Sequence, residues 1–160
     1  MRVGATLAGG FMGTLVLTTM LRMASELRLT RVDIPFLLGT ALTSDRLRAK
    51  AAGYVLHFGF GLLFALGYHA IFVALDRAGW LLGAALGLGH GMFSGTALVN
   101  ILLPLVHPRM GNPFSSIDSH ALVEAPGFLM LNYGRRTPVV TLAAHLAYGA
   151  LVGGFAVLAR

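Results

Sequence analysis

Four long apolar stretches dominate the chain, and each is long enough to cross a lipid bilayer. A helix needs about 20 residues to span roughly 30 Å of hydrocarbon. The stretches cover residues 3–23, 51–75, 80–106 and 138–158. Because they are continuously apolar rather than alternating, they predict helices and not the strands of a barrel. We therefore expect an all-α, polytopic membrane protein, with residues 1–160 forming a single domain built as a four-transmembrane-helix bundle.

Two longer polar segments, residues 24–50 and 107–137, separate these stretches, and a short hairpin at residues 76–79 joins the second to the third. With four spans, both longer segments must lie on the same side of the membrane. That side, counted from Arg22, carries nine of the twelve Lys and Arg side chains. The positive-inside rule therefore predicts that both segments are cytoplasmic and that both termini lie outside.

The composition agrees with a membrane environment. The chain is 56% hydrophobic and 11% charged, with a mean hydropathy of +0.77, whereas soluble domains have roughly 25% charged residues. Its formal charge of +6 is suited to anionic lipid head groups, so we expect the lipid bilayer as a partner and no nucleic acid. The chain contains no cysteine, which excludes disulfides, thiolate metal sites and cysteine nucleophiles.

The two halves of the sequence share short matching features in the same order. The first half contains Gly13-Thr14, Asp33-Ile34-Pro35 and His57 with Gly61 four residues later; the second contains Gly95-Thr96, Glu124-Ala125-Pro126 and His145 with Gly149. Both halves enter the membrane in the same direction. This order predicts a parallel tandem repeat of two helical hairpins, related by a pseudo-twofold axis along the membrane normal.

Glycines recur at every fourth position of the third stretch and again in the fourth. They are Gly83, Gly87, Gly91 and Gly95, followed by Gly149 and Gly153. This spacing forms a ridge without side chains, which lets a neighbouring backbone approach closely. The ridge predicts helix packing within the chain; the alternatives are contact with another subunit or with a flat cofactor.

Histidines inside the apolar stretches are the main candidates for chemistry, because intramembrane polar groups are costly. His57 and His145 lie at similar depth, so two imidazoles could ligate a haem iron or a metal ion. Three further nitrogen and oxygen donors could complete a transition-metal site: His120, Glu124 and Asp33. The alternative is that each histidine is hydrogen-bonded to a neighbouring helix, which we expect for His69 and His90. Haem b or a transition metal is therefore compatible with the sequence but not required by it.

No catalytic motif supports an enzyme. The chain has no Gly-x-Ser-x-Gly elbow, no phosphate-binding loop and no metalloprotease or di-iron helix motif. The first hypothesis is a non-catalytic integral membrane subunit or scaffold that packs within a larger complex or a homo-oligomer. The second is a haem- or metal-binding redox protein that uses His57 and His145. The third is a small transporter that works at the repeat interface.

Several segments together resemble a family of small bacterial four-helix integral membrane proteins of unknown function. They are the Gly-Thr pair of the first stretch and residues 33–39 (DIPFLLG), 57–61 (HFGFG) and 145–149 (HLAYG). The resemblance spans nearly the whole chain, although residues 107–136 form a longer segment than this family would lead us to expect. It implies a bacterial cell (inner) membrane and transfers no catalytic residue.

Overall fold

The structure, a computed structural model, describes residues 2–111 and 123–158. Within these residues it contains no strand, and an isolated bridge between Met110 and Val123 is its one β-type pairing. Four helices are long and apolar enough to span a membrane: α1 (Val3–Glu26), α3 (Arg46–Ala74), a compound helix over Trp80–Val106, and α6 (Thr137–Leu158). The all-α, four-helix prediction is confirmed.

The third spanning helix changes its winding partway along. It begins as α4 (Trp80–Phe93), continues as the π-helix η1 (Ser94–Leu102) and ends as α5 (Leu103–Val106). Pro104 near the start of α5 has no N–H, so it cannot donate to the carbonyl four residues earlier, which belongs to Asn100. The Asn100 amide donates to the carbonyls of Gly95 and Thr96, each at 2.9 Å. This half-buried polar side chain therefore supports the altered backbone, and π-helical segments often accompany functional sites.

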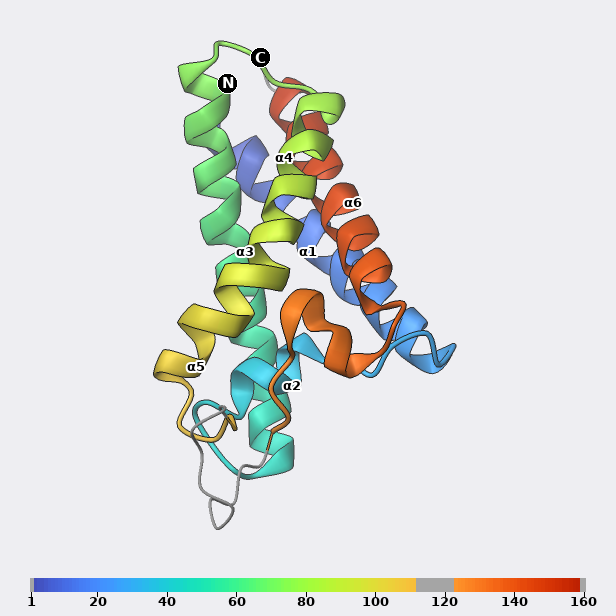
Figure 1. The fold of residues 1–160 in the computed structure, drawn as a ribbon. Coiled ribbons are helices and arrows are strands. Elements are labelled where there is room, and N and C mark those ends of the chain that lie inside the picture. The colour runs from blue at the N-terminus through green and yellow to red at the C-terminus, as the bar shows by residue number, and fades with distance from the viewer. Residues whose placement is uncertain (1, 112–122, 159–160) are drawn as a thin grey trace.

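Two short helices lie at one end of the bundle (Figure 1). They are α2 (Ile34–Gly39) and the 3-10 helix η2 (Phe128–Tyr133). Asp33 caps α2, because its carboxylate accepts a 2.9 Å hydrogen bond from the backbone N–H of Phe36. The α2 backbone packs directly on α3, where a Cβ on Gly53 would lie only 1.7 Å from the carbonyl oxygen of Pro35. The close approach requires glycine at position 53.

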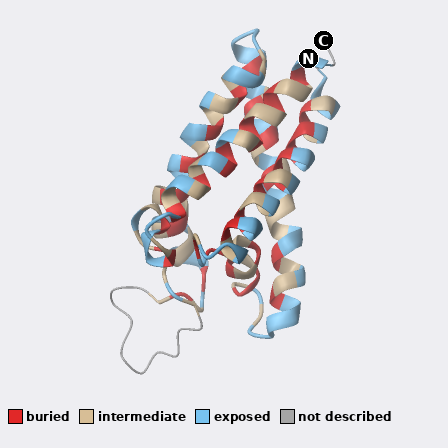
Figure 2. Ribbon diagram, turned by 90° about the vertical axis from the view of Figure 1, so that its right-hand side faces the viewer, coloured by how far each residue is buried: buried red, intermediate tan, exposed pale blue. Residues whose placement is uncertain are grey.

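The spanning helices pack in the order α4, α6, α1 and α3. Figure 1 shows that α1 begins and α6 ends at the same end of the bundle. In Figure 2 the buried residues gather where helices face one another, and exposed residues lie on the outer faces. Large apolar side chains such as Leu63 and Leu81 are 60% and 66% exposed. Such faces are stable against lipid tails rather than water.

The glycine ridge is used inside this chain. A Cβ on Gly83 would lie 2.1 Å from the carbonyl oxygen of Gly149, and one on Gly87 would lie 2.3 Å from that of His145. Further along, Gly91 lies beside the His145 side chain and Gly95 faces Leu129 of η2. The backbones of α4 and α6 therefore nearly touch, and Gly153 sits in the same contact.

The packing of the two halves differs from the twofold arrangement that a tandem repeat predicts. In such a repeat α1 corresponds to α4, and α3 corresponds to α6. A pseudo-twofold axis would therefore require α4 to pack on α3 as closely as α1 packs on α6. In the described chain, α1 packs closely on α6, whereas α3 and α4 make few close backbone contacts. The matching acids also differ, since Asp33 caps α2 while η2 begins after Gly127 without a side-chain cap. The space between α3 and the compound helix holds side chains and a cavity.

Candidate functional site: a histidine-lined cavity

A partly open cavity of about 310 Å³ lies between α3 and the compound helix. Residues of α1, α2, α6 and η2 complete its wall. Pockets that bind small molecules have volumes of roughly 300–1,000 Å³ and are lined mainly by apolar and aromatic side chains. By size and lining, the cavity belongs to this class.

The cavity wall has an aromatic part and an aliphatic part, which come from different elements. Flat rings come from His57, Phe60 and Phe64 of α3, from His90 of α4, and from His145 and Tyr148 of α6. Aliphatic side chains come from η1, α5 and α2. The cavity therefore has one wall of rings and one wall of branched alkyl groups.

The rings form a connected cluster around His90. Its ring centroid lies 3.8 Å from that of Phe64, with an angle of 32° between the planes. The centroid of His145 lies 4.8 Å away and that of Tyr148 5.6 Å away, both nearly edge-on. The His90 Nδ1 atom also lies 3.4 Å from the Tyr68 hydroxyl. Three helices thus bring their rings together at this end of the cavity.

Most polar atoms in the wall have partners within the protein. The Tyr148 hydroxyl donates to the carbonyl oxygen of Gly61 at 2.5 Å. Nδ1 of His145 donates to the carbonyl oxygen of Thr141 at 2.8 Å, which leaves Nε2 of a neutral ring as an acceptor. The exception is His57, whose Nε2 atom is buried without a hydrogen-bond partner in the described chain. An unsatisfied buried group of this kind costs about 1–3 kcal/mol.

The cavity wall contains no Asp, Glu, Lys or Arg among the described residues. An ionised group placed in such a wall would lose its hydration and gain no counter-charge. The cavity is therefore suited to neutral molecules.

The predicted metal ligands are only partly brought together. His57 and His145 line the same cavity, whereas the Asp33 carboxylate caps α2. The Glu124 side chain lies 3.3 Å from the Arg31 guanidinium, and His120 lies outside the described residues. Among residues 2–111 and 123–158, no three His, Asp or Glu side chains are placed to hold a metal ion.

His90 takes a place that its sequence position did not indicate. We expected it, like His69, to be a structural hydrogen-bonding group; the His69 Nδ1 lies 3.1 Å from the Thr6 hydroxyl. His90 also meets a neighbouring helix through a polar contact, since its Nδ1 lies 3.4 Å from the Tyr68 hydroxyl of α3, and it lies in addition at the centre of the ring cluster. The sequence does contain one indication of this position. His90 lies between Gly87 and Gly91, and the glycine ridge marks the face of α4 that packs on α6.

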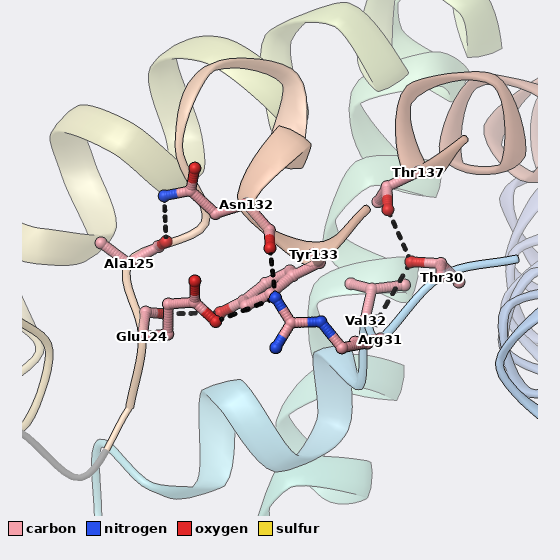
Figure 3. A network of polar contacts seen from close by, with 8 residues as sticks. All are labelled: Thr30, Arg31, Val32, Glu124, Ala125, Asn132, Tyr133 and Thr137. Carbon is pink, nitrogen blue, oxygen red and sulfur yellow. Dashed lines mark hydrogen bonds and ion pairs between the residues drawn. The ribbon is translucent and has the colours of Figure 1, made fainter. Parts of the chain in front are cut away.

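A polar network holds η2 beneath the bundle (Figure 3). The Tyr133 hydroxyl donates to the Glu124 carbonyl oxygen at 2.6 Å, and the Arg31 guanidinium donates to the Asn132 carbonyl oxygen at 2.5 Å. Burial, reinforced by the Glu124 carboxylate and opposed by Arg31, raises the pKa of Tyr133 to about 12. The network fixes η2, whose Met130 lines the cavity.

A second set of contacts joins α5 to α2. The His107 Nδ1 atom accepts from the Arg109 N–H at 3.2 Å, so its Nε2 carries the proton and donates to the Leu37 carbonyl oxygen at 3.0 Å. The Arg109 guanidinium donates to the carbonyls of Thr40 and Ala41 at 2.9 and 3.2 Å. These bonds connect the two elements that supply much of the aliphatic wall.

Comparison with protein families, curated proteins and solved structures finds no match to this chain.

Proposed function

We propose that this protein is a non-catalytic membrane protein that holds a neutral, lipid-soluble small molecule within its helix bundle. The observation that carries the proposal is the cavity of about 310 Å³ between α3 and the compound helix. The cavity is partly open, since Phe60 and Leu105 of its wall are 44% and 77% exposed. Pockets of this size with an apolar and aromatic lining are typical of small-molecule sites.

The chemistry of the wall supports the class of ligand. The absence of charged side chains from the described wall disfavours nucleotides, amino acids and ions, which need charged or strongly polar partners. The surrounding helices have apolar outer faces, so a lipid-soluble molecule could reach the opening through the membrane.

The alternatives have less support. The subunit hypothesis drew on the glycine ridge, and that ridge packs against α6 and η2 of the same chain. Association with other membrane proteins or with a second copy stays a prediction. The haem or metal alternative needs further donors, and in the described chain Asp33 and Glu124 have other contacts. A transporter would need a second, alternately open state of the same cavity.

The proposal can be tested by filling the cavity from one side chain. Leu98 of η1 lines it, whereas Ile101 of the same π-helix is 60% exposed and lies outside the lining. Leu98→Trp should fill the space, and Ile101→Trp adds the same ring to the outer face as a matched control. Both proteins are purified in lipid nanodiscs, and their organic extracts are compared with wild type by mass spectrometry.

We expect a neutral lipophilic compound enriched in wild type and Ile101→Trp over empty nanodiscs. Overpacking costs of about 1–3 kcal/mol correspond to a loss of about fivefold or more in Leu98→Trp. Equal recovery from both variants, with both still folded by thermal unfolding, would refute ligand binding in this cavity.

A further inference from the structure

We infer that the ligand is a quinone-type molecule, with a flat, oxygen-bearing ring beside His57 and an apolar tail along η1 and α5. The inference rests on the proposed function and names the chemical class that fits the same cavity. It is carried by the division of the wall into rings and alkyl groups, together with the unpaired nitrogen of His57.

The ring-lined part of the cavity is suited to a flat head group. His57, Phe60 and Phe64 face the cavity from α3, and His90, His145 and Tyr148 face it from α4 and α6. Aromatic rings pack on one another in offset or edge-on arrangements with centroids 4.5–7 Å apart. Because Phe64, His90 and His145 already pack on one another, a planar ring would lie against the cavity side of this cluster rather than between its rings.

The aliphatic part is suited to a tail. Leu98, Leu102 and Val106 line the cavity from successive turns of η1 and α5, and Leu37 and Leu38 of α2 also contribute. Val106 follows His90 by 16 residues of nearly continuous helix, or roughly 24 Å at 1.5 Å per residue. The cavity wall is thus long and becomes purely apolar away from the histidines.

His57 can supply the polar contact that the head group needs. Its ring lines the cavity, and its Nε2 is buried without a partner in the described chain, so the ring must turn within its site to bring this atom to a head group. A neutral imidazole has one N–H donor and one acceptor nitrogen. It can therefore donate to the carbonyl oxygen of a quinone or accept from the hydroxyl of the reduced quinol, and both forms are neutral.

Other membrane lipids fit less well. A phospholipid would place its charged head group against a wall without charged side chains, or its apolar tail against the unpaired imidazole. A plain hydrocarbon would leave His57 Nε2 unsatisfied, at a cost that a hydrogen-bonding ring removes.

The test compares two probes that share a tail and differ in the ring oxygens: radiolabelled decyl-benzoquinone and decylbenzene. Saturable binding to the protein in nanodiscs is measured above that of empty nanodiscs. His57→Leu removes the hydrogen-bonding group and keeps the bulk. His69→Leu on the same helix is the matched control, because His69 bonds Thr6 and does not line the cavity. His57→Gln restores a donor and an acceptor.

We expect the quinone to bind more tightly than decylbenzene. His57→Leu should lose roughly three- to tenfold in quinone affinity, His57→Gln should recover part of it, and His69→Leu should bind as wild type. Equal affinities for the two probes, or an unchanged quinone affinity in a folded His57→Leu protein, would overturn the quinone inference and leave ligand binding intact. No saturable binding of either probe, with Leu98→Trp indistinguishable from wild type, would overturn the proposed function as well.

Discussion

The hydroxyl of Tyr148 donates a 2.5 Å hydrogen bond to the carbonyl oxygen of Gly61, and so joins α6 to α3 beside the cavity. Gly61 has no room for a side chain, since a Cβ there would lie 1.9 Å from the Thr14 hydroxyl oxygen of α1. That hydroxyl donates to the Gly10 carbonyl oxygen at 2.7 Å. Three helices therefore meet at Gly61, and their contact sets the width of the cavity on this side.

Tyr148→Phe should lower the free energy of unfolding by about 1 kcal/mol, because it removes this interhelical hydrogen bond and keeps the ring. Tyr54→Phe is the matched control, since Tyr54 is 44% exposed. Thermal unfolding in detergent or nanodiscs measures both variants. Identical unfolding of the two would show that the Tyr148 bond contributes nothing to stability.

Gly87→Ala should destabilise the bundle by about 1–3 kcal/mol, the usual cost of overpacking. The added methyl group would lie 2.3 Å from the His145 carbonyl oxygen, and backbone cannot move aside as a flexible side chain can. Gly89→Ala lies in the same helix with nothing within 4 Å of its added Cβ, so it should be neutral or slightly stabilising. Comparing the unfolding of the two separates crowding from helix propensity; a stable Gly87→Ala would contradict the close contact.

The fold could be predicted from the sequence because bilayer thickness and helix rise fix the length of an apolar span. A close helix contact along the third span could also be predicted, since Gly83 and Gly87 recur at the spacing that exposes backbone along one side of a helix. Such spacing does not identify the neighbouring helix. The contact with α6, rather than with another subunit, depends on the order in which the helices pack.

The cavity could not be predicted, because it arises where the two halves of the chain differ. Gly9 and Gly13 let α1 touch α6, where added Cβ atoms would lie 2.8 and 2.9 Å from side chains of α6. Between α3 and the compound helix, large rings such as Phe64 and His90 meet instead and keep the backbones apart. The short sequence matches between the two halves indicate a repeat. They do not show that small residues line one helix contact while large rings line the other.

Tyr133 should make stability depend on pH between about 10 and 12. Its pKa is raised to about 12 in the folded protein, from an ordinary value of about 10. The folded state therefore holds the phenol proton more tightly than the unfolded state. The stabilisation is present below pH about 10 and is lost as the pH rises towards 12.

The difference in unfolding free energy between wild type and Tyr133→Phe isolates this effect from the other tyrosines. At neutral pH the variant should be less stable by about 1 kcal/mol, because the bond to the Glu124 carbonyl is lost. The difference should shrink as the pH rises from 10 to 12. A difference that stays constant over this range would contradict the raised pKa of Tyr133.

Both ends of the chain should lie outside the cytoplasm, with α2 and η2 on the cytoplasmic side. The start of α1 and the end of α6 lie at the same end of the bundle (Figure 1), so both termini lie on the same side of the membrane in either orientation. The basic side chains decide between the two orientations, because nine of the twelve, counted from Arg22, lie on the side of the long segments.

A fluorescent protein that matures only in the cytoplasm should stay dark when fused after Arg160 and should fluoresce when inserted between Thr43 and Ser44. Alkaline phosphatase, which is active only outside the cytoplasm, should give the opposite pattern at the same two sites. Fluorescence at the C-terminal fusion together with phosphatase activity at the insertion would invert the topology, and would mean that the arginines near α2 and η2 serve the structure rather than its orientation.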